Sequence, residues 1–205
     1  MKEISIFIND LDKMLMYKNV FDYVNDTINN LAKQKEVYQY LIKKMEEYPI
    51  KRLYFGNEFC QFQLPNMEDF EKACDTASQY NLKLTLVTPA INYIGISNVK
   101  KLLDQKKLYC NLNLEVVCND WGCVQMISDE HPDIELVLGR TLCKVIKEFR
   151  YNSKDYENLY TQEGMEYIQS LPIFSKYSLK VLKRYNIKQC EFDVMPQGVI
   201  IPNTE

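Results

Sequence analysis

Short β-rich runs alternate along this chain with longer segments in which apolar residues recur at helical spacing. The expected strands cover residues 4–8, 52–55, 82–87, 114–118, 134–138 and 190–194. The expected helices cover residues 36–48, a segment after Asn66, a segment capped by Ser97, a short segment from Trp121, and residues 178–185. Strands that alternate with helices at this spacing are typical of parallel βα units, so the sequence predicts an α/β fold.

The number of expected strands limits the architecture. A closed eightfold barrel usually needs about 250 residues, whereas this chain has 205 residues and only six runs typical of strands. Because we find no tandem repeat and no Gly/Ser linker, we expect a single α/β domain over residues 1–205, a partial or open TIM-like barrel. An open parallel sheet leaves an unpaired edge. This edge predicts a partner, either a second copy in a homodimer or a second barrel subunit.

The charge and hydropathy of the chain limit the classes of partner and the cellular location that we expect. Lys and Arg total 25 and Asp and Glu total 28, for a net charge of −3. This charge does not support RNA or an anionic membrane as a partner, since both favour a basic surface, and a small-molecule substrate stays open. No apolar run approaches the roughly 20 residues of a membrane-spanning helix, and no secretory signal is recognisable. We therefore expect a cytoplasmic protein whose 7 cysteines are reduced thiols or metal ligands.

Polar residues and cysteines gather at or just after the carboxyl ends of the expected strands, where the sites of parallel α/β proteins lie. They are Glu58, Cys60, Thr88, Cys118, Asn119, Asp120, Trp121, Cys123, Arg140 and Cys143. The single histidine, His131, precedes Pro132 in an expected solvent-exposed loop at the opposite end. A Ser–His–Asp or Cys–His arrangement would need this histidine, and no HExxH motif is present. The sequence therefore offers no recognisable protease constellation.

Two neighbouring motifs in the second half of the chain carry a family resemblance. Residues 114–122 read Leu-Glu-Val-Val-Cys-Asn-Asp-Trp-Gly, and residues 136–142 read Leu-Val-Leu-Gly-Arg-Thr-Leu. Together they resemble the signature of the peptidase U32 (collagenase-like) family. Residues 54–60 are similar to an element of its small iron–sulphur branch, and residues 190–193 fit the strand before its second cysteine-rich segment. The resemblance covers about residues 50–198 and suggests a short relative that is truncated at its C-terminus.

The resemblance implies a TIM-barrel-like core and several alternative activities. Some members of the family are peptidases, and others take part in oxygen-independent, anaerobic hydroxylation of RNA bases or of a quinone precursor. Several of these bind a 4Fe–4S cluster through four cysteines. Only Cys60 of this chain stands at a family-like cysteine position. Cys123 replaces a residue that is usually apolar, and Cys143 occupies a position often held by Asn.

These observations define a candidate site with three kinds of residue. The expected catalytic residues are Glu58, Asp120 and Arg140. The expected substrate-binding residues are Asn119, Trp121 and Thr88. The expected metal ligands, for an iron–sulphur cluster or a structural zinc ion, are Cys60, Cys118, Cys123 and Cys143.

Each group of site residues also has a structural alternative. Asp120 precedes a helix and is better suited to be its N-cap than a general base. Arg140 either clamps an anionic ligand or forms an ion pair with Glu58 or Asp120. Trp121 either stacks on a ring substrate or packs its helix onto the sheet. The cysteines are alternatively small buried apolar residues.

Three functional hypotheses follow from the residues and the resemblance. The first is a U32-like protein that works as an iron–sulphur-dependent hydroxylation factor, or as one subunit of it, in anaerobic metabolism. The second is a non-catalytic, truncated barrel that acts as a partner or scaffold subunit. The third is a collagenase-like peptidase, which ranks last because no nucleophile–base pair and no metalloprotease motif is present.

Overall fold

The computed structural model describes residues 3–8, 10–31, 35–152 and 160–202. The chain divides into two compact units, residues 1–116 (unit 1) and residues 117–205 (unit 2). The expectation of one domain over the whole chain stays a prediction. No helix within the described ranges is long and apolar enough to cross a membrane.

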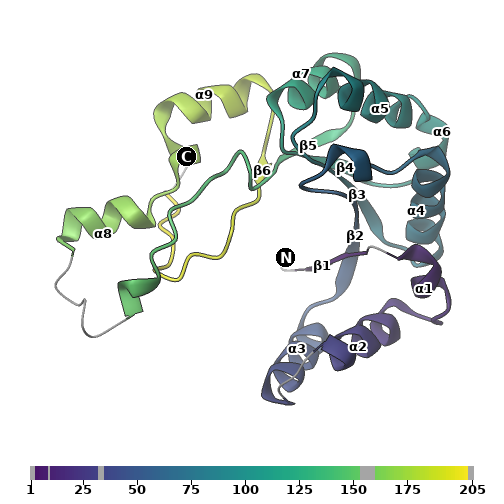
Figure 1. Cartoon of the computed structure of the whole chain (residues 1–205), viewed down its shortest axis with the longest axis horizontal. Coiled ribbons are helices and arrows are strands. Elements are labelled where there is room, and N and C mark those ends of the chain that lie inside the picture. Colours follow the sequence, from purple (N-terminus) through teal and green to yellow (C-terminus); the bar gives the residue numbers. More distant parts are fainter. Residues whose placement is uncertain (1–2, 9, 32–34, 153–159, 203–205) are drawn as a thin grey trace. The chain divides into compact units, whose positions relative to one another are not determined.

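Six strands form one sheet in which their spatial order follows their order in the sequence (Figure 1). The strands are β1 (Ile4–Phe7), β2 (Ile50–Gly56), β3 (Lys83–Thr88), β4 (Leu114–Cys118), β5 (Glu135–Leu138) and β6 (Gln189–Cys190). Strand β2 pairs in parallel with β1 and β3, and β5 pairs in parallel with β6. Parallel strands in sequential order with helices between them are the arrangement of a βα barrel. Since β1 and β6 end the order, the predicted open, barrel-like α/β fold is confirmed.

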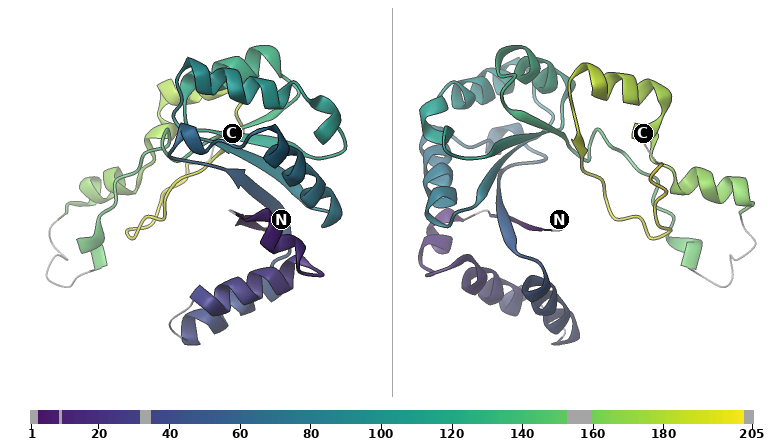
Figure 2. Two further views of the ribbon diagram at one scale, coloured as in Figure 1. Left: turned by 45° about the vertical axis from the view of Figure 1, so that its right-hand side comes forward. Right: turned by 180° about the vertical axis from the view of Figure 1, so that it is seen from behind.

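The helices of unit 1 follow the expected pattern in part. They are α1 (Leu11–Leu15), α2 (Val20–Leu31), α3 (Lys35–Glu47), α4 (Met67–Gln79), α5 (Tyr93–Leu103) and α6 (Lys106–Tyr109). Helices α4 and α5 lie on the same side of β2 and β3 (Figure 2). The expected cap of α4 is confirmed, because Asn66 accepts a hydrogen bond from the Asp69 N–H. Ser97 as the cap of α5 was wrong: Asn92 accepts from the N–H groups of Ile94 and Gly95, so the helix begins earlier.

The helices of unit 2 are α7 (Trp121–Glu130), α8 (Gln162–Gln169) and α9 (Lys176–Arg184). The expected strand at residues 190–194 is shorter, because only Gln189 and Cys190 pair with β5. The expectation of a solvent-exposed loop histidine was also wrong. His131 ends α7 as its C-cap and is only 2% exposed.

A buried polar network joins strands β2, β3 and β4 within unit 1. Arg52 Nη1 lies 3.2 Å from Glu115 Oε2 and 3.3 Å from the Thr85 hydroxyl. The Thr85 hydroxyl donates to Glu115 Oε1 at 2.7 Å. Arg52 is 6% exposed, Glu115 2% and Thr85 0%. Buried charges are stable in a protein when they are paired and hydrogen-bonded, and this network satisfies that condition.

Candidate functional site at the carboxyl ends of β4 and β5

Asn119 follows β4 and fixes the turn that follows β5. Its side chain is buried, and its Oδ1 accepts from the Thr141 N–H at 3.0 Å and lies 2.6 Å from the Thr141 hydroxyl. Gly139 packs directly against it, because a Cβ atom at Gly139 would lie 2.2 Å from Asn119 Oδ1. The asparagine of the first sequence motif therefore meets the glycine of the second. The two motifs that carry the family resemblance are therefore in direct contact in the structure.

Asp120 is the N-cap of α7. Its Oδ1 accepts hydrogen bonds from the Gly122 N–H at 2.7 Å and from the Cys123 N–H at 3.2 Å. The first N–H groups of a helix have no partner within the helix, so this carboxylate satisfies two of them. The structural alternative proposed for Asp120 matches this geometry.

Trp121 is the first residue of α7 and remains 42% exposed. Its ring centroid lies 6.4 Å from that of Tyr185, with the two planes tilted by 35°. The Tyr185 hydroxyl donates to Gln125 Oε1 at 2.7 Å. Trp121 therefore contacts the end of α9 through Tyr185 and still presents part of its ring to solvent.

Arg140 forms an ion pair with Asp193, which lies beyond β6. Arg140 Nη1 is 2.7 Å from Asp193 Oδ1, and Lys147 Nζ is 2.6 Å from Asp193 Oδ2. Hydrogen bonds from Lys147 and then from Arg140 lower the pKa of Asp193, so its carboxylate stays charged below the usual range. From the sequence, Arg140 was expected either to clamp an anionic ligand or to form an ion pair with Glu58 or Asp120. The structure gives it Asp193 as a partner.

Four cysteines of unit 2 form two pairs. Cys118 Sγ lies 3.7 Å from Cys123 Sγ, and both side chains are fully buried. Cys143 is also buried, and its Sγ lies 3.7 Å from the carbonyl oxygen of Leu138, the residue of β5 that pairs with the partly exposed Cys190. The interaction between the two thiols raises the pKa of Cys143 and lowers the pKa of Cys190. Cys190, which was not among the expected ligands, therefore interacts with one of them, Cys143.

No three of the His, Cys, Asp and Glu side chains in the described ranges lie together as metal ligands would. Of the four expected ligands, Cys118, Cys123 and Cys143 belong to unit 2 and Cys60 belongs to unit 1. The cluster or zinc site therefore stays a prediction.

The remaining predicted residues, Glu58, Cys60 and Thr88, lie in unit 1. Thr88 ends β3 and is fully buried. Glu58 and Cys60 follow β2 in a loop held by Asn57, whose Oδ1 accepts from the N–H groups of Phe59 and Cys60 at 2.9 and 2.7 Å. This is the local side-chain-to-backbone bonding by which Asn stabilises turns.

An open pocket of about 510 Å³ lies beside the motif residues of unit 2. Trp121, Thr141, Leu142, Cys143 and Lys144 form one part of its wall. The other part comes from the segment before α9 and from α9 itself: Pro172, Ile173, Tyr177, Ser178 and Val181. Apolar and aromatic side chains predominate, as they do in small-molecule sites of similar volume. Of the predicted residues, Trp121 and Cys143 reach this pocket.

A second open pocket, of about 830 Å³, lies in unit 1 where β1 and β2 end. Several of its charged and polar side chains bond to neighbouring residues of unit 1. Asp10 caps α1, Asn66 caps α4, and Lys72 forms an ion pair with Asp12. The sequence analysis assigned no role to Asp10 or Asp12.

Sequence reasoning gave no role to Thr141, Lys147 or Asp193, and it did not pair Cys190 with Cys143. Two of them carried a signal: Thr141 directly follows the Gly-Arg of the second motif, and Asp193 lies near the end of the expected last strand, residues 190–194. Lys147 carried no signal of this kind. Cys190 opens the same expected strand, but the sequence did not indicate its partner, because that contact depends on how distant segments meet.

Comparison of the sequence with models of known families gave no match, and neither curated proteins nor solved structures gave one. The likeness to the peptidase U32 family therefore remains a resemblance in the motifs.

Proposed function

We propose that this chain is a non-catalytic, U32-like open barrel that acts as a partner or scaffold subunit. One observation carries the proposal: the motif residues are engaged in holding the fold. Asn119 is bonded to Thr141, Asp120 caps α7, and Arg140 is paired with Asp193. A general base or an anion clamp has to reach its substrate. Side chains held in this way stabilise the ends of β4 and β5 without a ligand.

The sheet edge at β1 supports a subunit role. The N–H groups of Ile4 and Ile8 donate to Pro49 and Tyr54, so they face β2. Because neighbouring N–H groups of a strand point to opposite sides, the N–H of Phe7 points to the other edge, where no described strand pairs. The Phe7 side chain is 47% exposed. Such an edge is suited to pair with a strand of a second chain.

The test is the mass of the purified chain by light scattering, together with iron and zinc analysis after anaerobic purification. We expect a metal-free dimer that the Phe7→Pro substitution converts to monomer, since proline removes the outward N–H. Phe7→Ala is the matched control, because it removes the same side chain and keeps the N–H. A monomer that carries stoichiometric iron would contradict the proposal.

A second candidate function is the iron–sulphur-dependent hydroxylation factor. The contact of Cys118 with Cys123 favours it, as does the position of Cys143 and Cys190 on either side of Leu138, because four thiols of one unit then form two neighbouring pairs. Iron and sulphide in fixed ratio to protein, with the visible absorption of a cluster, would support this function. Anaerobically purified protein without iron would contradict this function.

A cytoplasmic location is part of the proposal, since all 7 cysteines are free thiols, as expected in a reducing compartment. A collagenase-like peptidase remains the weakest alternative. The single histidine of the chain is buried at the end of α7, where it is not placed to activate a nucleophile for an external substrate. Cleavage of gelatin by the wild type that is lost in Asp120→Asn would support the peptidase function.

A further inference from the structure

The two cysteine pairs of unit 2 differ in their access to solvent. Cys118 and Cys123 have sulfur atoms 3.7 Å apart, and both are 0% exposed. Cys143 is 4% exposed, whereas its partner Cys190 is partly exposed. Only the second pair therefore combines a thiol that an oxidant can reach with a second thiol behind it.

The end of β5 brings Cys143 and Cys190 together. Cys190 lies in β6, directly opposite Leu138 of β5. The chain then turns back after β5, because the Cys143 N–H donates to Gly139 O at 3.1 Å and Cys143 Sγ lies 3.7 Å from Leu138 O. The Glu191 N–H donates to the same Leu138 oxygen at 2.8 Å. Leu138 thus has both Cys143 and the β6 strand as neighbours. The two thiols are close enough that each is the main cause of the other's pKa shift, which is upward for Cys143 and downward for Cys190.

We propose that Cys190 and Cys143 are a redox-active dithiol that closes to a disulfide when the protein meets a peroxide. The half-exposed Cys190 attacks the peroxide as thiolate, takes one oxygen and becomes a sulfenic acid, while the O–O bond breaks and water leaves after protonation. The Cys143 sulfur then displaces the sulfenic oxygen, which leaves as a second water with the Cys143 proton. Two thiols and one hydrogen peroxide give one disulfide and two waters.

The disulfide would join β6 covalently to the segment that follows β5. Cys143 also lines the pocket beside Trp121, so oxidation changes one wall of that pocket. The inference does not depend on the proposed subunit role, because the thiol contact lies within unit 2.

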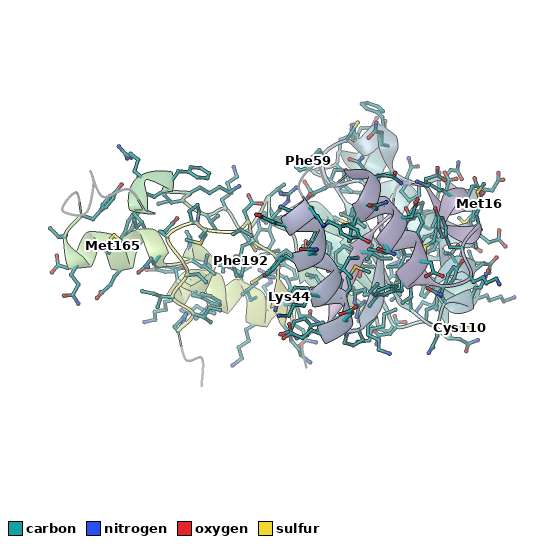
Figure 3. The ribbon with its side chains drawn as sticks, turned by 90° about the horizontal axis from the view of Figure 1, so that it is seen from below. Met16, Lys44, Phe59, Cys110, Met165 and Phe192 are labelled. Carbon is teal, nitrogen blue, oxygen red and sulfur yellow. The ribbon has the colours of Figure 1, made fainter. Side chains whose placement is uncertain are left out.

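The chain contains its own controls. Cys118 Sγ and Cys123 Sγ lie 3.7 Å apart but are closed to solvent, so they should stay reduced. Cys110 is exposed and lies at the surface of unit 1 (Figure 3). Because its side chain is exposed and its sulfur contacts a backbone carbonyl oxygen, that of Lys107, and not a second thiol, it should be alkylated before and after oxidation.

The experiment treats the reduced, desalted protein with one equivalent of hydrogen peroxide, blocks the remaining thiols with N-ethylmaleimide, and maps the cross-linked peptides by mass spectrometry. We expect one cross-link, between the peptides of Cys143 and Cys190, and its loss on addition of dithiothreitol. The Cys143→Ser variant should instead give a sulfenic acid at Cys190 that dimedone traps. The Cys118→Ser variant should form the cross-link as the wild type does.

The wild-type map alone can overturn the proposal, whether or not a variant folds. Full alkylation of Cys143 and Cys190 after peroxide would do so. A cross-link between Cys118 and Cys123 that forms as fast as the one between Cys143 and Cys190 would also overturn it. Two neighbouring thiols would then be oxidised whether or not solvent reaches them.

Discussion

Each unit contains an arginine paired with a carboxylate, and the two pairs differ in how deeply their side chains are buried. In unit 1, Arg52 and Glu115 are 3.2 Å apart, with side chains 7% and 2% exposed. In unit 2, Arg140 and Asp193 are closer, at 2.7 Å, but their side chains are 37% and 30% exposed. Removal of one partner from a buried pair leaves a charge that water cannot reach. Burial, and not the length of the contact, therefore decides how much the fold depends on each pair.

The sharpest test of this comparison is Glu115→Gln against Asp193→Asn. Both remove one negative charge and keep the shape of the side chain. We expect Glu115→Gln to lower the free energy of unfolding by about 3 kcal/mol, because Arg52 loses its buried counter-charge and keeps only the more exposed Glu3, 3.8 Å from its Nε. We expect Asp193→Asn to cost below about 1 kcal/mol, as exposed pairs do. Urea unfolding followed by circular dichroism measures both.

A double variant gives the control for this test. Replacement of both charges, as in Arg52→Met with Glu115→Leu, leaves no unpaired charge and should restore much of the stability that Glu115→Gln loses. Equal losses for Glu115→Gln and Asp193→Asn would show that burial does not separate the two pairs.

The next largest effect is expected at the contact of the two sequence motifs. A Cβ atom at Gly139 would lie 2.2 Å from Asn119 Oδ1, so Gly139→Ala has to displace a buried side chain. We expect a loss of about 1–3 kcal/mol in the free energy of unfolding, the usual cost of overpacking. Gly164→Ala in α8 is the matched control, since its nearest neighbour would lie 3.3 Å away.

The additional change Asn119→Ala should make room and reduce the cost of Gly139→Ala. If Gly139→Ala is as well tolerated as Gly164→Ala, the motifs do not lock each other, and the structural explanation of the resemblance fails.

A smaller effect separates the two roles considered for Asp120. As an N-cap, Asp120 should tolerate Asn, whose side-chain oxygen also accepts from the first N–H groups, whereas Asp120→Ala should cost about 1 kcal/mol. Thermal unfolding measures this difference. Equal stability of all three proteins would contradict the capping role. Loss of an activity in a fully stable Asp120→Asn protein would identify a catalytic carboxylate.

Much of the fold was predictable because it depends on local patterns. The strand Leu114–Cys118 and the start of α7 at Trp121 agree with the expectation, since a β-branched run and an Asp before a helix are signals within a few residues. Helices α1 and α2 were not predicted. The cap at Asn92 was missed because Ser97 inside the helix has the same capping chemistry.

The candidate site was less predictable, because its contacts join distant segments. The pair Arg140–Asp193 spans 53 residues, and Arg52 reaches Thr85 across 33. The residue types indicated that these side chains form ion pairs and hydrogen bonds, but they did not indicate which residue each one contacts. Arg52 and Glu115 were visible as charges inside apolar runs, a pattern that indicates either an exposed strand face or a buried pair. Only the packing of β2, β3 and β4 separates these two outcomes.

The smallest predicted effect tests the exposed pair through pH. Lys147 and Arg140 lower the pKa of Asp193 in the folded protein below its unfolded value of about 3.9. A lowered carboxyl pKa contributes stability that is complete above the unfolded pKa and is lost as the pH falls through the folded one. The difference in unfolding free energy between wild type and Asp193→Asn should therefore be constant above about pH 5 and shrink below about pH 4. Salt should reduce the same difference, because a half-exposed pair is screened. Urea unfolding of both proteins across this pH range, at low and high salt, measures it. A difference that grows on acidification would mean that Asp193 is stabilised in its protonated form, and the cluster with Arg140 and Lys147 would not be an ion pair in solution.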